Sequence, residues 1–375
     1  MPAATGSGGL GRVAGGATDV EPCALHDGSR RVAEQVDGID AANVRDWLRE
    51  RTGMAPPLDF ELIAGGRSNL TYRVADAHGS RWVLRRPPLH SVLASAHDVA
   101  REYRIMAALE ATPVPVPPLV GLEQDEAVTG APFYVMEFVD GIVPRDADAV
   151  VAAMDAPARR RAAFALADTL ADLHAVDIDA VGLGDMARRE DYIGRQLRRW
   201  QGQYEKGGSR ELPLVGEVHD RLAARIPDQG TAAIVHGDYR FDNMIVGADG
   251  EIRAVLDWEL CTLGDPLADV GLLAVYWEPP AGREMPMIPA AGSIPGMPPF
   301  REVAARYAER SGRDLGELDY YVAFGYWKLA IILEGVYARF SSGAYGATDG
   351  SHEVFGQLVI DLLELASDAA TSVGR

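Results

Sequence analysis

The sequence predicts an α+β fold of two lobes: a small N-terminal lobe built on an antiparallel sheet, and a larger C-terminal lobe that is mostly helical. A chain of 375 residues is too long for one small hydrophobic core. Short strand-like runs dominate as far as residue 139, and long helical patterns dominate after Asp140-Gly141. We therefore divide the chain into a disordered tail over 1–30, an N-terminal lobe over 31–138 and a C-terminal lobe over 139–375.

The N-terminal lobe is expected to contain two helices and five strands. Asp40 can cap a first helix, and a second helix should cover residues 98–110, where apolar residues recur at helical spacing. Strands are expected where apolar runs lie between turn residues, at Leu58–Ile63, Leu70–Val74, Arg81–Arg85, Leu119–Leu122 and Phe133–Val139. This order predicts a small antiparallel sheet with one helix packed against it.

The C-terminal lobe is expected to be helical around one β-hairpin, formed by Met244–Val246 and Ile252–Leu256. Asp265-Pro266 should start a helix that ends near Trp277, because an N-cap residue precedes proline. Residues 278–299 are rich in Pro, Gly and Met, which predicts a long irregular lid or binding loop. Further helices are expected at 157–176, 188–206, 214–226, 300–311, 317–340 and 352–367.

Composition argues against several classes of protein. The net charge of −19 disfavours nucleic acid or an anionic membrane surface as the main partner. It is compatible with a cationic substrate, or it serves only solubility. The first twenty residues lack the basic start and apolar run of a signal peptide, and no apolar run reaches the roughly 18 residues of a membrane helix. Cys23 and Cys261 cannot form a disulfide framework, so we expect a cytoplasmic protein of undetermined oligomeric state.

The stretch His236–Asn243, together with Asp257, indicates phosphoryl transfer. Asp238 would orient the proton of an attacking hydroxyl, and Asn243 and Asp257 offer the oxygen ligands that Mg²⁺ prefers. The intervening hairpin should return Asp257 to the side of Asn243. Each of these residues alone is common in turns, but their combined spacing favours catalysis over a structural role.

Two other residues of this stretch receive lesser roles. His236 is expected to support the loop through a hydrogen bond rather than to act in catalysis. Asp242 stays open, since it could be a solvated turn residue.

Three features of the N-terminal lobe suit a nucleotide. The first is a glycine-rich turn formed by Gly65, Gly66, Ser68 and Asn69. Its backbone could approach phosphates closely, although a glycine pair between strands is more often a simple hairpin turn. The second is Arg85, which Glu102 could hold against phosphates, unless the two form only a surface pair; Arg86 lies on the opposite strand face. The third is a possible hinge, where adenine could bond to the backbone near Glu137 and Val139.

These motifs, in this order, resemble those of the aminoglycoside phosphotransferase and choline-kinase family of protein-kinase-like enzymes. The resemblance runs from about residue 55 to 340. His236-Gly-Asp238…Asn243 is similar to the family's catalytic loop, and Asp257 in Leu-Asp-Trp-Glu to its metal aspartate. The Gly65–Asn69 turn is similar to its nucleotide loop, and Val135–Val139 to the kinase hinge. The resemblance implies ATP and Mg²⁺ as cofactors and a small-molecule hydroxyl as acceptor.

The resemblance also implies that Asp269 supports the catalytic loop from a buried position. One departure is Arg85, which stands where most kinases carry lysine, so the nucleotide geometry could differ. The motifs Val-Leu-Arg-Arg-Pro-Pro and Leu-Asp-Trp-Glu most resemble those of a subgroup also found fused to certain acyl-CoA dehydrogenases. That resemblance implies phosphorylation of hydroxyacyl compounds. This weakens the case for an aminoglycoside acceptor.

The function is therefore expected to be an ATP- and Mg²⁺-dependent kinase of a hydroxylated, possibly cationic, small molecule. A hydroxyacyl or choline-type acceptor is one alternative, and a nucleotide-binding regulator without turnover is another, for which the departure at Arg85 argues. Phosphorylation of proteins is disfavoured, because no activation segment is recognisable. Five aromatic residues could line the acceptor site or simply belong to the core: Tyr276, Trp277, Tyr320, Tyr326 and Trp327.

Overall fold

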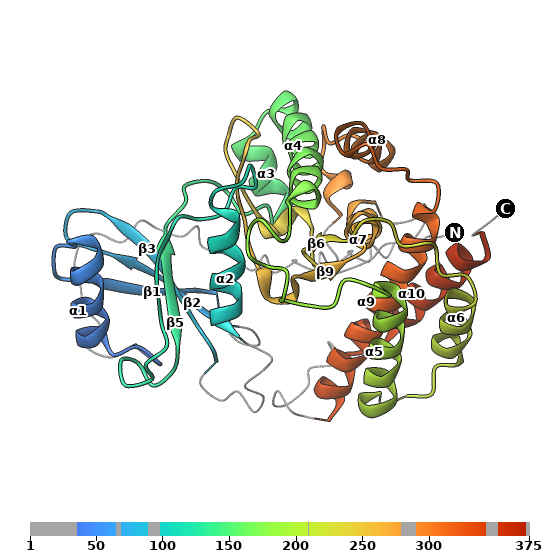
Figure 1. Cartoon of the computed structure of the whole chain (residues 1–375), viewed down its shortest axis with the longest axis horizontal. Helices are drawn as coiled ribbons and strands as arrows, with labels where there is room; N and C mark the ends of the chain where they lie inside the picture. The colour runs from blue at the N-terminus through green and yellow to red at the C-terminus, as the bar shows by residue number, and fades with distance from the viewer. Residues whose placement is uncertain are drawn as a thin grey trace, which may run out of the picture.

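The chain folds into two lobes, as expected (Figure 1). The computed structural model describes residues 36–64, 69–88, 98–208, 210–278, 290–342 and 352–372. The predicted tail over 1–30 lies outside the described residues, and so do Gly65, Gly66 and Ser68. Among the described residues, no helix combines the length and the apolar character that crossing a membrane requires.

The N-terminal lobe is a five-stranded antiparallel sheet with strand order β1-β2-β3-β5-β4. Its strands are β1 Asp59–Ala64, β2 Leu70–Ala75, β3 Arg81–Arg86, β4 Leu119–Glu123 and β5 Phe133–Glu137. All five were expected, within two residues at each end. The expected fifth strand was two residues too long, because β5 ends at Glu137.

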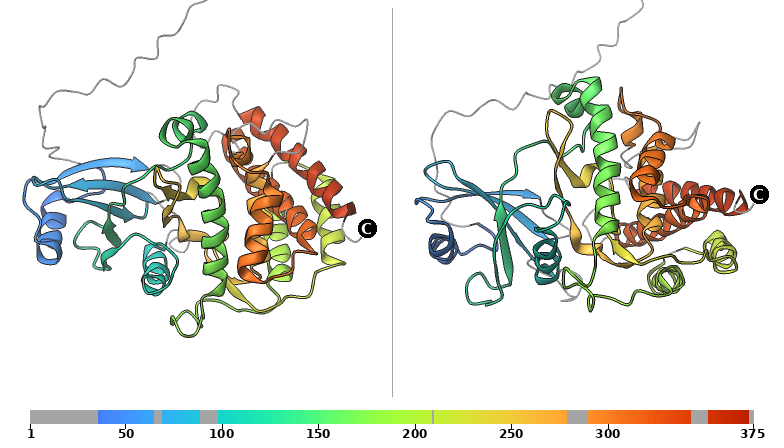
Figure 2. Two further views of the ribbon diagram at one scale, coloured as in Figure 1. Left: turned by 90° about the horizontal axis from the view of Figure 1, so that it is seen from above. Right: turned by 45° about the horizontal axis from the view of Figure 1, so that its top comes forward.

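A helix covers each face of this sheet, rather than the one face expected. Helix α1 (Ala41–Thr52) packs on the face that carries Trp82 and Leu84, and α2 (Val99–Leu109) packs on the face that carries Val83. Figures 1 and 2 show α1 on the outer side of the sheet and α2 on the side of the C-terminal lobe. Because side chains alternate along β3, Arg85 shares the α2 face with Val83.

The C-terminal lobe is built around α7, which two hydrophobic cores share. Val270 and Leu273 belong to the core that includes Tyr239 and Phe241, whereas Leu272 and Val275 belong to the core shared with α9. A helix that is buried all round makes a rigid platform for the residues at its start. The main helices are α4 Ala156–Ala175, α5 Tyr192–Gly207, α6 Pro213–Ala223, α7 Leu267–Trp277, α8 Phe300–Ser311, α9 Leu318–Ser341 and α10 His352–Ser372.

The C-terminal lobe also contains two short antiparallel pairs of strands. The expected hairpin is β7 (Met244–Val246) with β8 (Ile252–Val255), and a second pair joins β6 (Ala233–Val235) to β9 (Thr262–Gly264). Strands β6 and β9 were not predicted, because three residues are too few to show a period. The short helix α3 (Ala147–Ala153) was not predicted either.

The aromatic residues of the C-terminal lobe belong to the core, which was one of their two expected roles. All five are buried: Tyr276, Trp277, Tyr320, Tyr326 and Trp327. Trp277, Tyr320 and Trp327 donate their polar hydrogens to backbone carbonyls, as buried rings usually do. Of the expected 278–299 loop, residues 279–289 lie outside the described part, and a 3₁₀ turn forms at Ala291–Ser293.

Candidate active site

The loop between β6 and β7 is held by hydrogen bonds to Asp269, in the first turn of α7. Its carboxylate accepts the backbone N–H groups of His236 at 2.7 Å and Gly237 at 2.8 Å. His174 contacts the same carboxylate at 3.3 Å. Burial alone would raise the pKa of Asp269, but the hydrogen bonds and charge of its partners lower it. Asp269 thus occupies the buried supporting position that the family resemblance implied.

Gly237 has to be glycine. Its φ of +84° lies in the left-handed region, and an added Cβ would lie 2.7 Å from the carbonyl oxygen of Leu260. The loop therefore bends sharply directly before Asp238. The Asp238 side chain after this bend is 25% exposed, whereas His236, Gly237 and Tyr239 beside it are buried.

His236 is a structural residue, as predicted. Its buried ring lies 2.9 Å, through Nε2, from the carbonyl oxygen of Leu256 and accepts the N–H of Asp238 at Nδ1, 3.3 Å away. An accepting Nδ1 requires the proton on Nε2, so the neutral ring joins two loops. Leu256 also donates its N–H to the carbonyl of Asn243 at 2.8 Å. The segment that carries Asp257 is thereby fixed beside Asn243, where the hairpin was expected to bring it.

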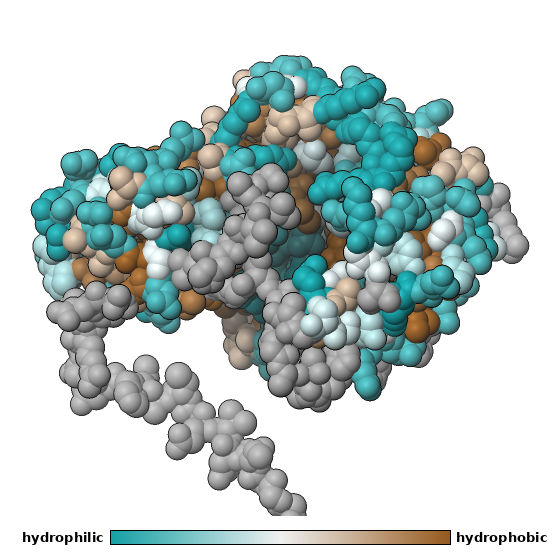
Figure 3. Space-filling view, turned by 90° about the horizontal axis from the view of Figure 1, so that it is seen from below, coloured by the Kyte–Doolittle hydropathy of each residue, from teal (hydrophilic) through white to brown (hydrophobic). Residues whose placement is uncertain are grey.

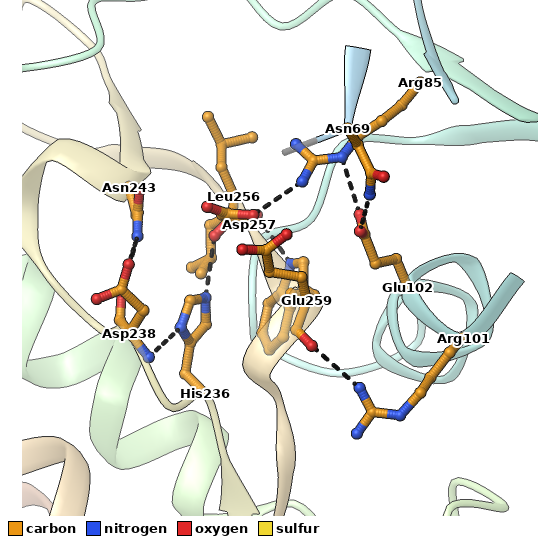
Figure 4. Close-up of polar contacts among 12 residues, drawn as sticks. Asn69, Arg85, Arg101, Glu102, His236, Asp238, Asn243, Leu256, Asp257 and Glu259 are labelled. Atoms are coloured by element: carbon orange, nitrogen blue, oxygen red, sulfur yellow. Dashed lines mark hydrogen bonds and ion pairs between the residues drawn. The ribbon is translucent and has the colours of Figure 1, made fainter. Parts of the chain in front are cut away.

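Asn243 turns its amide nitrogen toward Asp238. The Nδ2 group donates to the backbone carbonyl of Asp238 at 2.9 Å and to its Oδ2 at 3.0 Å (Figure 4). Both N–H groups of the amide are therefore engaged within the loop, and the Oδ1 atom is the part of Asn243 left for a cation.

Asp257 links the two lobes. It has a left-handed backbone with φ 65°, an uncommon conformation for a residue other than glycine that often marks a functional site. Its Oδ1 accepts Nη2 of Arg85 at 2.8 Å, and Nε of Arg85 lies 3.0 Å from Glu102. One guanidinium thus spans two carboxylates from different lobes (Figure 4). The planar fork of arginine suits this bridge better than the point charge of lysine, which gives the departure at Arg85 a physical reason.

Glu102 is the buried end of this bridge. It is 2% exposed and accepts Nδ2 of Asn69 at 2.5 Å and the hydroxyl of Tyr134 at 3.0 Å. Burial raises its pKa, and the charge of Arg85 opposes that shift. Asn69 was expected in the nucleotide loop. Its own burial and its bond to Glu102 favour a supporting role, whereas Arg86 points away and bonds to the carbonyls of Gly38 and Thr129.

Two charged residues near Asp238, Arg240 and Asp242, were not predicted as site residues. Arg240 pairs with Asp242 at 2.8 Å, its Nε lies 3.7 Å from Asp238, and its guanidinium stacks on the ring of Tyr276 at 4.7 Å. Asp242 is buried rather than solvated, and burial raises its pKa. Every second residue from Asp238 to Asp242 is charged, and this alternation was the available signal.

Glu259 is a further carboxylate that received no role. Its side chain lies beside Asp257 in Figure 4. Burial, and then the charge of Asp257, raise its pKa to about 7, and its buried Oε2 has no hydrogen-bond partner among the described residues. The Asp-x-Glu spacing in Leu-Asp-Trp-Glu was the signal that could have identified it.

The donor set fits Mg²⁺, provided that phosphates complete the coordination. Among the described residues, no three His, Cys, Asp or Glu side chains form a cage of their own. Mg²⁺ characteristically takes one or two protein oxygens and fills its octahedron with water and substrate phosphates. Oδ2 of Asp257 and Oδ1 of Asn243 are oxygens of that kind.

The expected hinge lies at the end of β5. The N–H of Glu137 already donates to the carbonyl of Pro118 at 2.8 Å, so it is not free for a base, and Val139 follows in the segment that joins the lobes. In the space-filling view a hollow separates the two lobes (Figure 3). A small cavity of about 160 Å³ borders the loop of Asp238, and its wall includes Arg240 and Asp242 of that loop together with Arg145 and Tyr276.

The sequence profile of the phosphotransferase enzyme family matches residues 59–320, more than half of the chain. Acyl-CoA dehydrogenase family member 10 of Mus musculus is 35% identical over 327 residues, which cover 85% of this chain and 30% of that protein. Acyl-CoA dehydrogenase family member 11 of Gallus gallus is 34% identical over 318 residues, with 83% and 40% covered. The chain therefore spans less than half the length of these curated relatives.

Solved structures confirm the two-lobed fold. A protein of Ralstonia eutropha, provisionally described as an aminoglycoside phosphotransferase, superimposes with a TM-score of 0.76 at 32% identity, covering 90% of this chain and 99% of that one. An aminoglycoside phosphotransferase in ternary complex with AMP-PNP and hygromycin B gives a TM-score of 0.56 at 16% identity, covering 87% and 99%. At that identity the likeness extends to the fold alone.

Proposed function

Since this chain belongs to the phosphotransferase enzyme family, we propose that it is a kinase that transfers the γ-phosphoryl group of ATP, with Mg²⁺, to a hydroxyl of a small molecule. One observation carries the proposal. The loop of Asp238 and Asn243 and the segment of Asp257 are hydrogen-bonded to one another, and Arg85 ties that segment to the N-terminal lobe. Phosphoryl transfer needs this combination of a hydroxyl-orienting carboxylate, metal ligands and a cation.

Asp238 is the proposed catalytic residue. Its partly exposed carboxylate would accept a hydrogen bond from the acceptor hydroxyl and take its proton as the new O–P bond forms and the bond to the β-phosphate oxygen breaks. The hydrogen bond from Asn243 holds one of its oxygens in place. A fixed carboxylate aligns the hydroxyl for in-line attack, which is the main contribution a protein makes to this reaction.

Asn243 and Asp257 are the proposed Mg²⁺ ligands, and Glu259 is a further candidate. The ion would neutralise charge on the phosphates of ATP. We propose that the backbone of Gly65, Gly66 and Ser68 binds the phosphates of the nucleotide.

We propose that the remaining contacts to the nucleotide come from residues of the N-terminal lobe. Arg85, held by Glu102, would add positive charge beside the phosphates, and Asn69 would support Glu102. The carbonyl of Glu137 and the backbone of Val139 would serve the adenine.

A hydroxyacyl or hydroxy-acid acceptor is favoured over an aminoglycoside. The small cavity next to the catalytic loop carries two arginines, Arg145 and Arg240, and only Asp242 to balance them among its described residues. The two arginines would repel a polycation there, whereas a carboxylate or thioester oxygen could accept hydrogen bonds from them. Glu334, one of the scattered acidic residues of the C-terminal helices, is buried against Arg210.

The test is an assay of ADP formation with Mg²⁺, ATP and a panel of hydroxy acids, hydroxyacyl thioesters, choline and aminoglycosides. We expect one class of hydroxylated compound to stimulate ADP formation, and removal of Mg²⁺ by a chelator to abolish it. Tight ATP binding without stimulation by any acceptor would instead favour a regulator that binds nucleotide and does not turn over.

A further inference from the structure

A buried lysine on α9 contacts the loop that carries Asp238. Lys328, on α9, is 8% exposed, and its Nζ donates to the carbonyl oxygen of Gly237 at 2.9 Å. The same ammonium lies 5.6 Å from the centre of the Trp200 ring. Lysine is almost never so buried unless it is paired, because its charge loses hydration there.

The hydrogen bond acts on the peptide group that precedes Asp238. The carbonyl of this peptide is bonded to Lys328, and its N–H is bonded to Nδ1 of His236. A peptide group is planar, so fixing its two ends fixes the orientation of the whole plane. That orientation sets the backbone direction from which the Asp238 side chain projects. Asp269 holds the N–H of Gly237 one residue earlier.

The charges around Lys328 come from three elements. Asp238 of the loop and Asp269 of α7 are the carboxylates that attract it, and Arg199 of α5 is the cation that opposes them. Burial lowers the pKa of Lys328, and the two carboxylates oppose that shift. A methionine would fill similar space without the loss of hydration. The bond that lysine adds goes to the loop of the proposed catalytic residue.

We propose that Lys328 is a positioning residue for phosphoryl transfer: its ammonium locks the Gly237–Asp238 peptide and thereby aims the Asp238 carboxylate. This inference rests on the proposed function. It predicts that loss of the ammonium slows the chemical step while ATP binding is maintained. The reason is that Lys328 bonds to the loop of Asp238 and to none of the residues proposed to bind the nucleotide.

The experiment compares Lys328→Met, which removes the charge, with Lys328→Arg, which keeps it. We expect Lys328→Met to lower kcat about 10²-fold, as small misplacements of a reacting group do, with the KM for ATP changed by less than about 3-fold. Lys328→Arg should recover most of that loss. Glu334→Gln is the matched control, because it disturbs another buried charge on α9, the partner of Arg210. It should lower the melting temperature and leave kcat within about 3-fold of wild type.

Hydrogen–deuterium exchange of residues 236–243 gives a readout that needs no turnover. We expect exchange in this segment to rise in Lys328→Met while exchange in β7 and β8 stays unchanged. Equal kcat and equal exchange in Lys328→Met and wild type would overturn the inference. If the wild type proves to have no phosphotransferase activity, the proposed function fails. Faster exchange in Lys328→Met would then still support the lock on the loop, and unchanged exchange would reject it.

Should Lys328→Met not fold, the pH profile of Lys328→Arg decides. In the wild type, kcat should fall at alkaline pH as the ammonium loses its proton. In Lys328→Arg that fall should move to higher pH, because a guanidinium keeps its charge. An alkaline limb at the same pH in both proteins would reject the inference.

Discussion

Asp238 and Asp257, the two aspartates at the centre of the site, are held from opposite sides of the molecule. The loop of Asp238 is fixed within the C-terminal lobe, through Asp269 and Lys328. The segment of Asp257 is held from the N-terminal lobe, through Arg85 of β3 and Arg101 of α2. The orientation of Asp238 is thus set inside one lobe, whereas that of Asp257, one of the two proposed metal ligands, also depends on how the two lobes meet.

The largest expected effect is that of Asp238→Asn. An amide cannot take the hydroxyl proton, so kcat should fall about 10³-fold or more, while ATP affinity stays nearly unchanged. Steady-state kinetics and nucleotide titration measure the two quantities. Turnover close to that of the wild type would show that Asp238 is not catalytic. The proposed difference in role between Asp238 and Asp257 would then be wrong.

Asp269→Asn tests the anchor inside the C-terminal lobe. Loss of this buried charge should lower the free energy of unfolding by about 3 kcal/mol at pH 7. The pKa of Asp269 is lower in the folded state than in the unfolded chain, where it is about 3.9. Its stabilisation is therefore complete above that value and is lost as the pH falls through the folded-state pKa.

The difference in stability between wild type and Asp269→Asn should accordingly narrow below about pH 4. Chemical denaturation at several pH values measures it. Asp179→Asn is the control, because its pair with Arg189 lies on the surface and should matter little. A difference that stays constant down to acid pH would contradict an ionised Asp269.

Arg85→Ala tests the bridge between the lobes. It leaves Glu102 buried without its cation and Asp257 without its link, so kcat/KM for ATP should fall about 10²-fold. Arg86→Ala is the matched control on the opposite strand face: it should cost stability and leave the kinetics of ATP largely intact. Similar kinetic losses in the two variants would mean that the sheet, rather than the bridge, had been disturbed.

Arg101→Ala should have the smallest of these effects. Arg101 donates to the carbonyl of Glu259 (Figure 4) and to that of Cys261, two and four residues after Asp257. We expect kcat/KM for ATP to fall about 10-fold and hydrogen exchange to rise in residues 257–264, with the Asp238 loop unaffected. Arg104→Ala, which removes an exposed pair with Asp185, is the control. Faster exchange in residues 236–243 would show that the two anchoring systems are not separate.

Local patterns were enough to predict the longer helices and strands and the central motif. The spacing of Asp238, Asn243 and Asp257 on a hairpin could be read from the sequence, because neighbours along a chain stay close in space. The three-residue strands β6 and β9 could not, because their pairing brings together segments about thirty residues apart. Helix α1 was predicted, but its position on the second face of the sheet was not.

The sequence by itself determined the two-lobed fold, the family and the identity of the central motif, since these depend on residue type, period and spacing. The tertiary structure decided what surrounds that motif. Lys328 lies 91 residues beyond Gly237 and Arg85 lies 172 residues before Asp257, and no local pattern distinguishes either from a surface cation. Burial on folding removes water from these side chains, so each must bond to a particular partner in the protein. That bond is what makes an otherwise ordinary cation part of the site.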